Sequence, residues 1–147
     1  MCTGEFLSWD DNTFISGNHT LLPPTWHSVA VWWTNPDAGL WIPITYTAWG
    51  LLALTAQVPG ETGPTLDPYV FHFANLLLHV LAALVVFRLL EMLIKRRWPA
   101  AAGAALFALY PVQVEPVAWA MGLRDILGGL LTLAAIWQYL IAARTSS

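Results

Sequence analysis

The sequence predicts an all-α membrane protein with three or four transmembrane helices and an N-terminal region of short helices, one lying along the membrane. Of its 147 residues, 57% are hydrophobic and 10% are charged, whereas soluble domains carry about 25% charged residues. The mean hydropathy is +0.58. The stretch 69–87 has no formal charge, and a helix of this length nearly crosses the ~30 Å apolar core of a bilayer. Nine tryptophans and four tyrosines suit the membrane interface.

The region 1–68 is predicted to hold short helices and turns. Thr25 is a candidate N-cap for a short helix that runs through Trp33. The uncharged segment 40–58 is long enough for a short span, but its threonines and glutamine fit an interfacial helix at least as well. A Gly/Pro-rich loop, 59–68, follows.

The region 69–147 is predicted to contain three spans, at about 69–93, 98–117 and 126–143. Pro111 and Pro116 interrupt the second of them. The small residues of 100–105 predict close helix contact within it. Asp125 precedes the last apolar run and can cap its N-terminus.

The basic cluster Lys95–Arg97 predicts a cytoplasmic turn, by the excess of Lys and Arg on that side of membranes. With three spans, residues 1–68 and 111–125 are then extracytoplasmic, and 94–98 and 144–147 are cytoplasmic. The protein is expected in a cytoplasmic (inner) membrane, in contact with lipid and with other membrane protein chains. All six Lys and Arg residues lie at or after Arg88, so the sequence does not predict a nucleic-acid partner.

Three polar side chains interrupt the first span. His72, Asn75 and His79 lie at i, i+3 and i+7 and therefore share one helix face. Polar groups inside a membrane face protein or a wet cavity, so we expect these three to face protein. Two histidines without a third nearby ligand do not predict a metal site, and no cofactor is indicated.

Acidic and basic residues gather in two further places. The adjacent carboxylates Asp10 and Asp11 can serve as a base, as metal ligands or as part of a solvated turn. Glu115, Arg124 and Asp125 return charge to the chain after the second span. A surface ion pair between Glu115 and Arg124 is the structural alternative to a role in binding.

Seven short motifs occur in one order along nearly the whole chain: Trp9-Asp-Asp-Asn12, Thr25-Trp26, Trp41-Ile-Pro-Ile-Thr45, His72-Phe-Ala-Asn-Leu-Leu-Leu-His79, Ala105-Leu-Phe-Ala-Leu-Tyr-Pro111, Val114-Glu-Pro-Val-Ala-Trp119 and Arg124-Asp125. The ordered set resembles the N-terminal part of the polytopic membrane glycosyltransferases with the GT-C fold, in the transmembrane O-mannosyltransferase-like group associated with tetratricopeptide repeats. The resemblance implies a polyprenyl-phosphate-linked sugar donor and a hydroxyl-bearing acceptor. It also implies that 40–58 lies along the membrane.

The resemblance assigns roles to individual residues. Asp10 or Asp11 matches the loop carboxylate that acts as the base or catalytic acidic group. Arg124 would be the cation beside the donor phosphate, and Glu115 and Asp125 would orient it. His72 and His79 match polar positions of the first retained helix.

The sequence also departs from the family pattern. Members have a spanning helix before the acidic pair and many further spans, which predicts that this chain is truncated. Tyr110 and Gln113 stand where the family usually has histidines, and Leu123 stands where a second polar or basic residue is usual. Two functions therefore stay open: sugar transfer as part of a GT-C enzyme, and a non-catalytic membrane subunit that packs within a larger complex.

Overall fold

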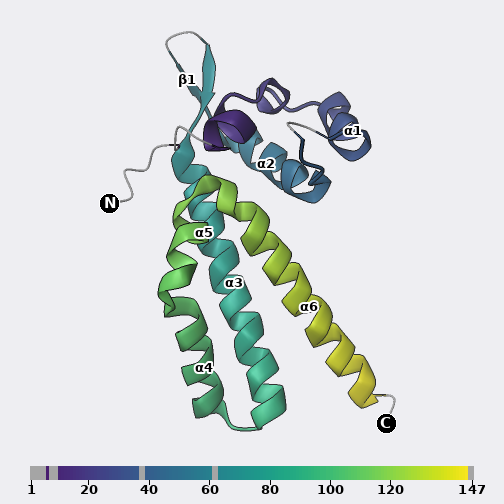
Figure 1. The fold of residues 1–147 in the computed structure, drawn as a ribbon, viewed down its shortest axis with the longest axis vertical. Helices are drawn as coiled ribbons and strands as arrows, with labels where there is room; N and C mark the ends of the chain where they lie inside the picture. Colours follow the sequence, from purple (N-terminus) through teal and green to yellow (C-terminus); the bar gives the residue numbers. More distant parts are fainter. Residues whose placement is uncertain (1–5, 7–9, 37–38, 61–62, 146–147) are drawn as a thin grey trace.

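The protein consists of a bundle of long helices with a smaller N-terminal region packed on one end (Figure 1). The computed structural model describes residues 6, 10–36, 39–60 and 63–145. The long elements are α3 (Pro68–Ile94), α4 (Arg97–Leu109) and α6 (Leu123–Thr145). The shorter ones are η1 (Asn12–Ser16), η2 (His19–Leu21), α1 (Trp26–Thr34), α2 (Pro43–Ala56), β1 (Gln57–Pro59), β2 (Pro64–Leu66), η3 (Pro111–Gln113), α5 (Val114–Ala118) and η4 (Ala120–Gly122).

Within the described residues, two helices are long and apolar enough to cross a membrane, and a bent pair makes a third candidate. α3 has a mean hydropathy of 2.3 over its most apolar window, and the last helix has 1.8 over Ala120–Thr145. The pair α4 and 111–118 bends by 48°, because Pro111 cannot donate a backbone hydrogen bond and stops α4. The predicted all-α membrane fold is confirmed.

The predicted close contact in the second span is confirmed by α4. Ala100 and Ala104 are buried, and α4 packs along α3. A Cβ on Gly103 would lie 2.7 Å from Leu90 Cδ1. Small residues thus let the two helices approach closely.

The basic end of the bundle is held by polar contacts. Glu91 pairs with Arg88 at 3.1 Å and with Arg97 at 2.9 Å. Lys95 follows the end of α3 in the left-handed conformation with φ 57° and forms no ion pair within the described residues. Arg144 Nη2 donates to the Met92 carbonyl at 2.5 Å, so α6 returns to α3 at this end. Residues 146–147, expected here, lie outside the described residues.

The longest helices described in the N-terminal region are α1 and α2, beside the shorter η1 and η2. Thr25 caps α1 as predicted, in a reciprocal pair of hydrogen bonds with Ser28. The 14 residues of α2 give a length of about 21 Å, short of the ~30 Å apolar core. A hairpin of β1 and β2 joins α2 to α3, and Asp67 N–H donates to the Ala56 carbonyl at 2.7 Å.

The hydrophobic core lies where the N-terminal region meets the bundle. It is formed by Phe14, Ile15, Leu21, Trp32, Tyr46, Trp49, Ala53, Ala56, Leu66, Phe71, Ala120, Met121 and Leu123. These residues come from both sides of residue 68, so the two predicted regions share one core. By contrast, only 17% of the apolar window of α3 and 6% of that of the last helix is buried. Lipid or further protein must therefore cover the spans.

Candidate functional site

The candidate site lies at the break between α4 and 111–118, where backbone groups lose their helical partners. Carbonyl groups in the last turn of a helix have no intrahelical donor, and inside a bundle they need another. Asn75 Nδ2 donates to the carbonyls of Trp119 at 2.6 Å and Pro116 at 3.3 Å. His79 Nε2 lies 3.1 Å from the Ala108 carbonyl, and because a carbonyl only accepts, Nε2 carries the proton.

Two of the three polar residues of α3 therefore face protein, and their partners are backbone groups. Asn75 is fully buried and His79 is 7% exposed, and the His79 ring stacks on Phe107. His72 is half-buried, and no hydrogen bond of its side chain is found within the described residues. No cluster of three or more potential metal ligands occurs among the described residues.

Asp11 also binds a backbone group near this break, on the segment that precedes α6. Its side chain is fully buried, and Oδ1 accepts a hydrogen bond of 2.8 Å from Met121 N–H. N–H groups at the start of a helix lack an intrahelical acceptor, and a carboxylate there is further favoured by the helix dipole. This bond joins residues 110 positions apart and brings the acidic pair to the start of α6.

Asp10 and Asp11 are thereby distinguished. Asp10 is exposed whereas Asp11 is buried. An acceptor hydroxyl must come within about 3 Å of a general base, and only the exposed Asp10 carboxylate can be approached without moving the core. The helical backbone at 10 and 11 also differs from a simple solvated turn.

The remaining charged candidates lie in the first turn of α6 and just before it. Arg124 Nε pairs with Asp125 at 3.2 Å, and both side chains are partly exposed. Glu115 is exposed and forms no ion pair with Arg124 in the described residues. α6 begins at Leu123, three residues earlier than the predicted start at 126, so Asp125 lies in the first turn instead of the N-cap position.

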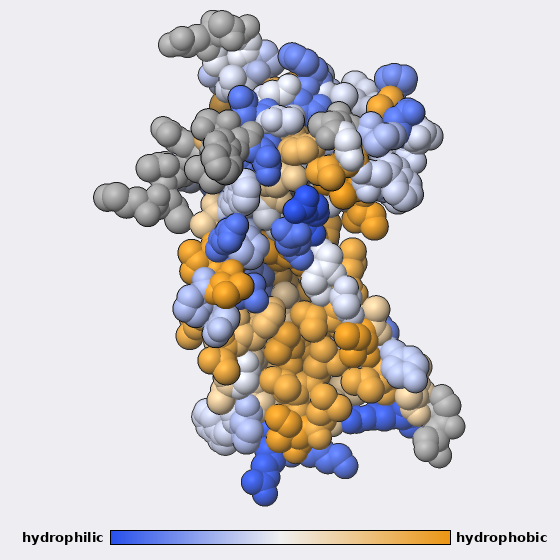
Figure 2. Space-filling model, viewed as in Figure 1, coloured by the Kyte–Doolittle hydropathy of each residue, from blue (hydrophilic) through white to orange (hydrophobic). Residues whose placement is uncertain are grey.

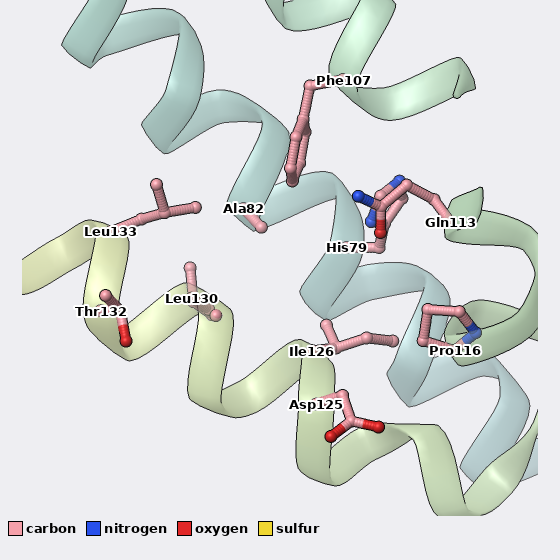
Figure 3. Close-up of a pocket in the computed structure, with 11 residues that line it drawn as sticks. His79, Ala82, Phe107, Gln113, Pro116, Asp125, Ile126, Leu130, Thr132 and Leu133 are labelled. Atoms are coloured by element: carbon pink, nitrogen blue, oxygen red, sulfur yellow. The ribbon is translucent and has the colours of Figure 1, made fainter. Parts of the chain in front are cut away.

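A cavity of about 410 Å³ opens between α3, α4 and α6 beside these residues (Figure 3). His79, Gln113, Asp125 and Thr132 are its polar lining residues. The rest of the lining is mostly apolar: Ala82, Phe107, Pro116, Ile126, Gly129, Leu130 and Leu133. Gln113 and Thr132 were not predicted as site residues, because no local sequence pattern shows which side chains line a cavity.

Asn75 gives a direct test of how the break is held. Asn75→Ala is expected to lower the free energy of unfolding by about 1–2 kcal/mol, because buried carbonyls of Pro116 and Trp119 lose a donor. His72→Ala, on the same helix, is the matched control and should change stability by less than half as much. Thermal unfolding of the purified protein in detergent measures both. Equal losses in the two variants would contradict a specific role for Asn75.

The candidate residues lie in a helical membrane protein that has an exposed Asp10, a partly exposed Arg124 and a mostly apolar cavity beside Asp125. Among curated proteins, the chain is similar to the human protein O-mannosyl-transferase TMTC1, with 37% identity over 75 residues. The mouse TMTC1 protein is 39% identical over 75 residues, and the Drosophila melanogaster protein O-mannosyl-transferase Tmtc2 is 32% identical over 90 residues.

These similarities cover only part of this chain and a small part of each relative. They cover 50% of this chain for the two TMTC1 proteins and 61% for Tmtc2. The matched segments span 8% of the two TMTC1 proteins and 10% of Tmtc2. No protein-family model matches the chain, and no solved structure does. The similarities support a relation to membrane glycosyltransferases.

Proposed function

We propose that this chain is part of a membrane glycosyltransferase of the GT-C type that transfers a sugar from a polyprenyl-phosphate donor to a hydroxyl acceptor. The observation that carries the proposal is the hydrogen bond from Met121 N–H to Asp11, in a chain similar to protein O-mannosyl-transferases. The bond brings the Asp10–Asp11 pair to the start of α6, where Arg124 lies. A carboxylate and a cation at one end of a membrane bundle suit this reaction.

The proposed roles follow from exposure and charge. The oxygen of the acceptor hydroxyl attacks the anomeric carbon of the sugar, and Asp10 accepts the proton of that hydroxyl. The bond from that carbon to the phosphate oxygen breaks, and the leaving phosphate takes the electron pair. Arg124 stabilises the phosphate through charge-assisted hydrogen bonds, and Asp125 orients the Arg124 guanidinium. Glu115 is proposed as an outer acidic residue of the same loop.

The proposed topology places residues 1–68 and 111–125 on the extracytoplasmic side. The basic residues support this orientation, because Arg97 and Arg144 lie with Glu91 at the opposite end of the bundle. A single cysteine at Ser16, in a chain with Cys2→Ser, would then react with an impermeant reagent in intact cells. Reaction only after permeabilisation would reverse the orientation.

A second function is favoured by a different observation. Asp11 is buried and bonded to the backbone, and large apolar side chains such as Trp98 and Leu109 are 86% and 81% exposed. These features suit a non-catalytic subunit of a larger membrane complex, in which the acidic pair only fixes the fold and the apolar faces contact other chains.

Arg124→Lys separates the two functions. The tagged chain is purified with the membrane complex that it occupies, and transfer is assayed from a polyprenyl-phosphate sugar. If the chain is part of an enzyme, Arg124→Lys should raise KM for the donor about tenfold or more, since a bidentate fork becomes a point charge. Arg88→Lys, at the other end of the bundle, is the control and should leave KM unchanged. If the complex with the native chain shows no detectable transfer, the enzymatic function is contradicted and the non-catalytic subunit function remains.

A further inference from the structure

The helices α1 and α2 form a single unit. Trp33 Nε1 donates to Thr47 Oγ1 at 3.1 Å and links the exposed sides of the two helices. Trp32 is 1% exposed, and a Cβ on Gly50 would lie 2.8 Å from its ring. Since only glycine permits this approach, α1 packs directly against the backbone of α2.

A groove of about 290 Å³ runs between the two helices. Its lining includes Trp26, Val29, Trp32, Gly50, Leu51 and Leu54, with no charged residue. Trp26 is 90% exposed, Leu51 64% and Leu54 59%. The volume is near the lower end of the about 300–1,000 Å³ typical of ligand pockets, which suits one segment of an apolar chain better than a whole polar ligand.

The unit lies beside the start of the candidate span α3. The hairpin β1–β2 and the bond between Asp67 and Ala56 fix the end of α2 directly beside the start of the span α3, and α2 also contacts α6. In Figure 2, hydrophobic residues fill the middle of the lower half of the molecule, with hydrophilic residues at its lower end, and a second hydrophobic group lies on the lower side of the upper region.

The charges of the N-terminal region indicate which part of a lipid it can bind. Between Asp11 and Asp67 the sequence has only two charged residues, Asp37 and Glu61, and no Lys or Arg. Such a surface cannot attract anionic headgroups, which bind through basic residues. It can bury apolar area in the interface, where tryptophans such as Trp26 and Trp41 are favoured.

We propose that the α1–α2 groove is a lipid-binding site, in which an acyl chain of a membrane phospholipid enters between Trp26 and Leu54. The uncharged and mostly apolar lining, to which Thr25 and Thr47 add hydroxyl groups, and the position beside the start of α3 both support an acyl chain. This inference does not rest on sugar transfer and holds for either proposed function. The bound lipid would fix the N-terminal region against the bilayer.

Spin-label depth measurements in phosphatidylcholine vesicles test the proposal. Single cysteines are placed in a Cys2→Ser chain at Trp26 and Leu54, with His27 and Gln57 as exposed controls on the same helices or their ends. Labels at 26 and 54 should collide more often with oxygen than with a water-soluble nickel complex, and labels at 27 and 57 should show the reverse. Added salt should not change this pattern, because no basic residue takes part.

A second measurement examines the groove itself. A phosphatidylcholine with a photoactivatable group on its acyl chain should cross-link to the peptide that contains Leu51 and Leu54. Val29→Trp fills the groove and should remove this cross-link, whereas Ala30→Trp, on the exposed side of α1, should keep it. Nickel access at 26 and 54 equal to that at the controls would overturn the proposal. So would exclusion of both reagents, which would indicate a protein partner, or a cross-link that persists in Val29→Trp.

Discussion

Replacing Asp10 with Asn is expected to slow sugar transfer by about 10²–10⁴-fold, the usual contribution of a positioned base, with no change in stability. Asp10 is exposed, so its carboxylate is available to an acceptor hydroxyl and contributes little to packing. Asn has nearly the same shape but cannot take the proton. The comparison of kcat/KM for the native and variant complexes measures the loss of transition-state stabilisation.

Asp11→Asn is the matched control for Asp10→Asn. The amide oxygen of Asn can still accept the hydrogen bond from Met121 N–H, so transfer should stay within about a few-fold of native, as expected for a residue that only positions others. Asp11→Ala leaves that N–H without this acceptor and should cost about 1–3 kcal/mol of stability. A large rate loss in Asp11→Asn with normal transfer in Asp10→Asn would exchange the roles of the two carboxylates.

Replacing Gly122 with Ala is expected to cause the largest loss of stability, at least about 3 kcal/mol, the upper part of the usual range for overpacking. A Cβ at this position would overlap the Pro116 carbonyl oxygen. The obstacle is backbone and cannot rotate away as a side chain would. Because Asn75 and Asp11 hold this loop from two sides, its displacement should disrupt the start of α6.

Gly128→Ala provides the control for Gly122→Ala. Gly128 lies in α6, and no other group comes within 4 Å of the place that an added methyl group would take. Alanine is also favoured over glycine in helices by up to about 1 kcal/mol, so Gly128→Ala should be neutral or stabilising. Thermal unfolding in detergent measures both variants, and similar melting temperatures for the two would show that the loop can relax around the added methyl group.

The membrane fold could be predicted from the sequence because its signals are local. An apolar run long enough for a span, a threonine at a helix start and prolines within an apolar run each act through neighbouring residues. The capped helix α1 and the break at Pro111 are confirmed.

The candidate site depended on contacts that no local pattern encodes. Sequence selected His72, Asn75 and His79 as one face, yet only the tertiary structure shows that Asn75 and His79 bind backbone groups 44 and 29 positions away. The catalytic roles of the candidate residues remain predictions.

By itself, the sequence determined that this protein is helical and belongs in a membrane, since hydropathy and helical spacing act over a few turns. Only the tertiary structure decided which carboxylate of the acidic pair is exposed. Asp10 and Asp11 are adjacent and chemically identical, and Asp11 is buried because folding brings Met121 N–H to it from the far end of the chain.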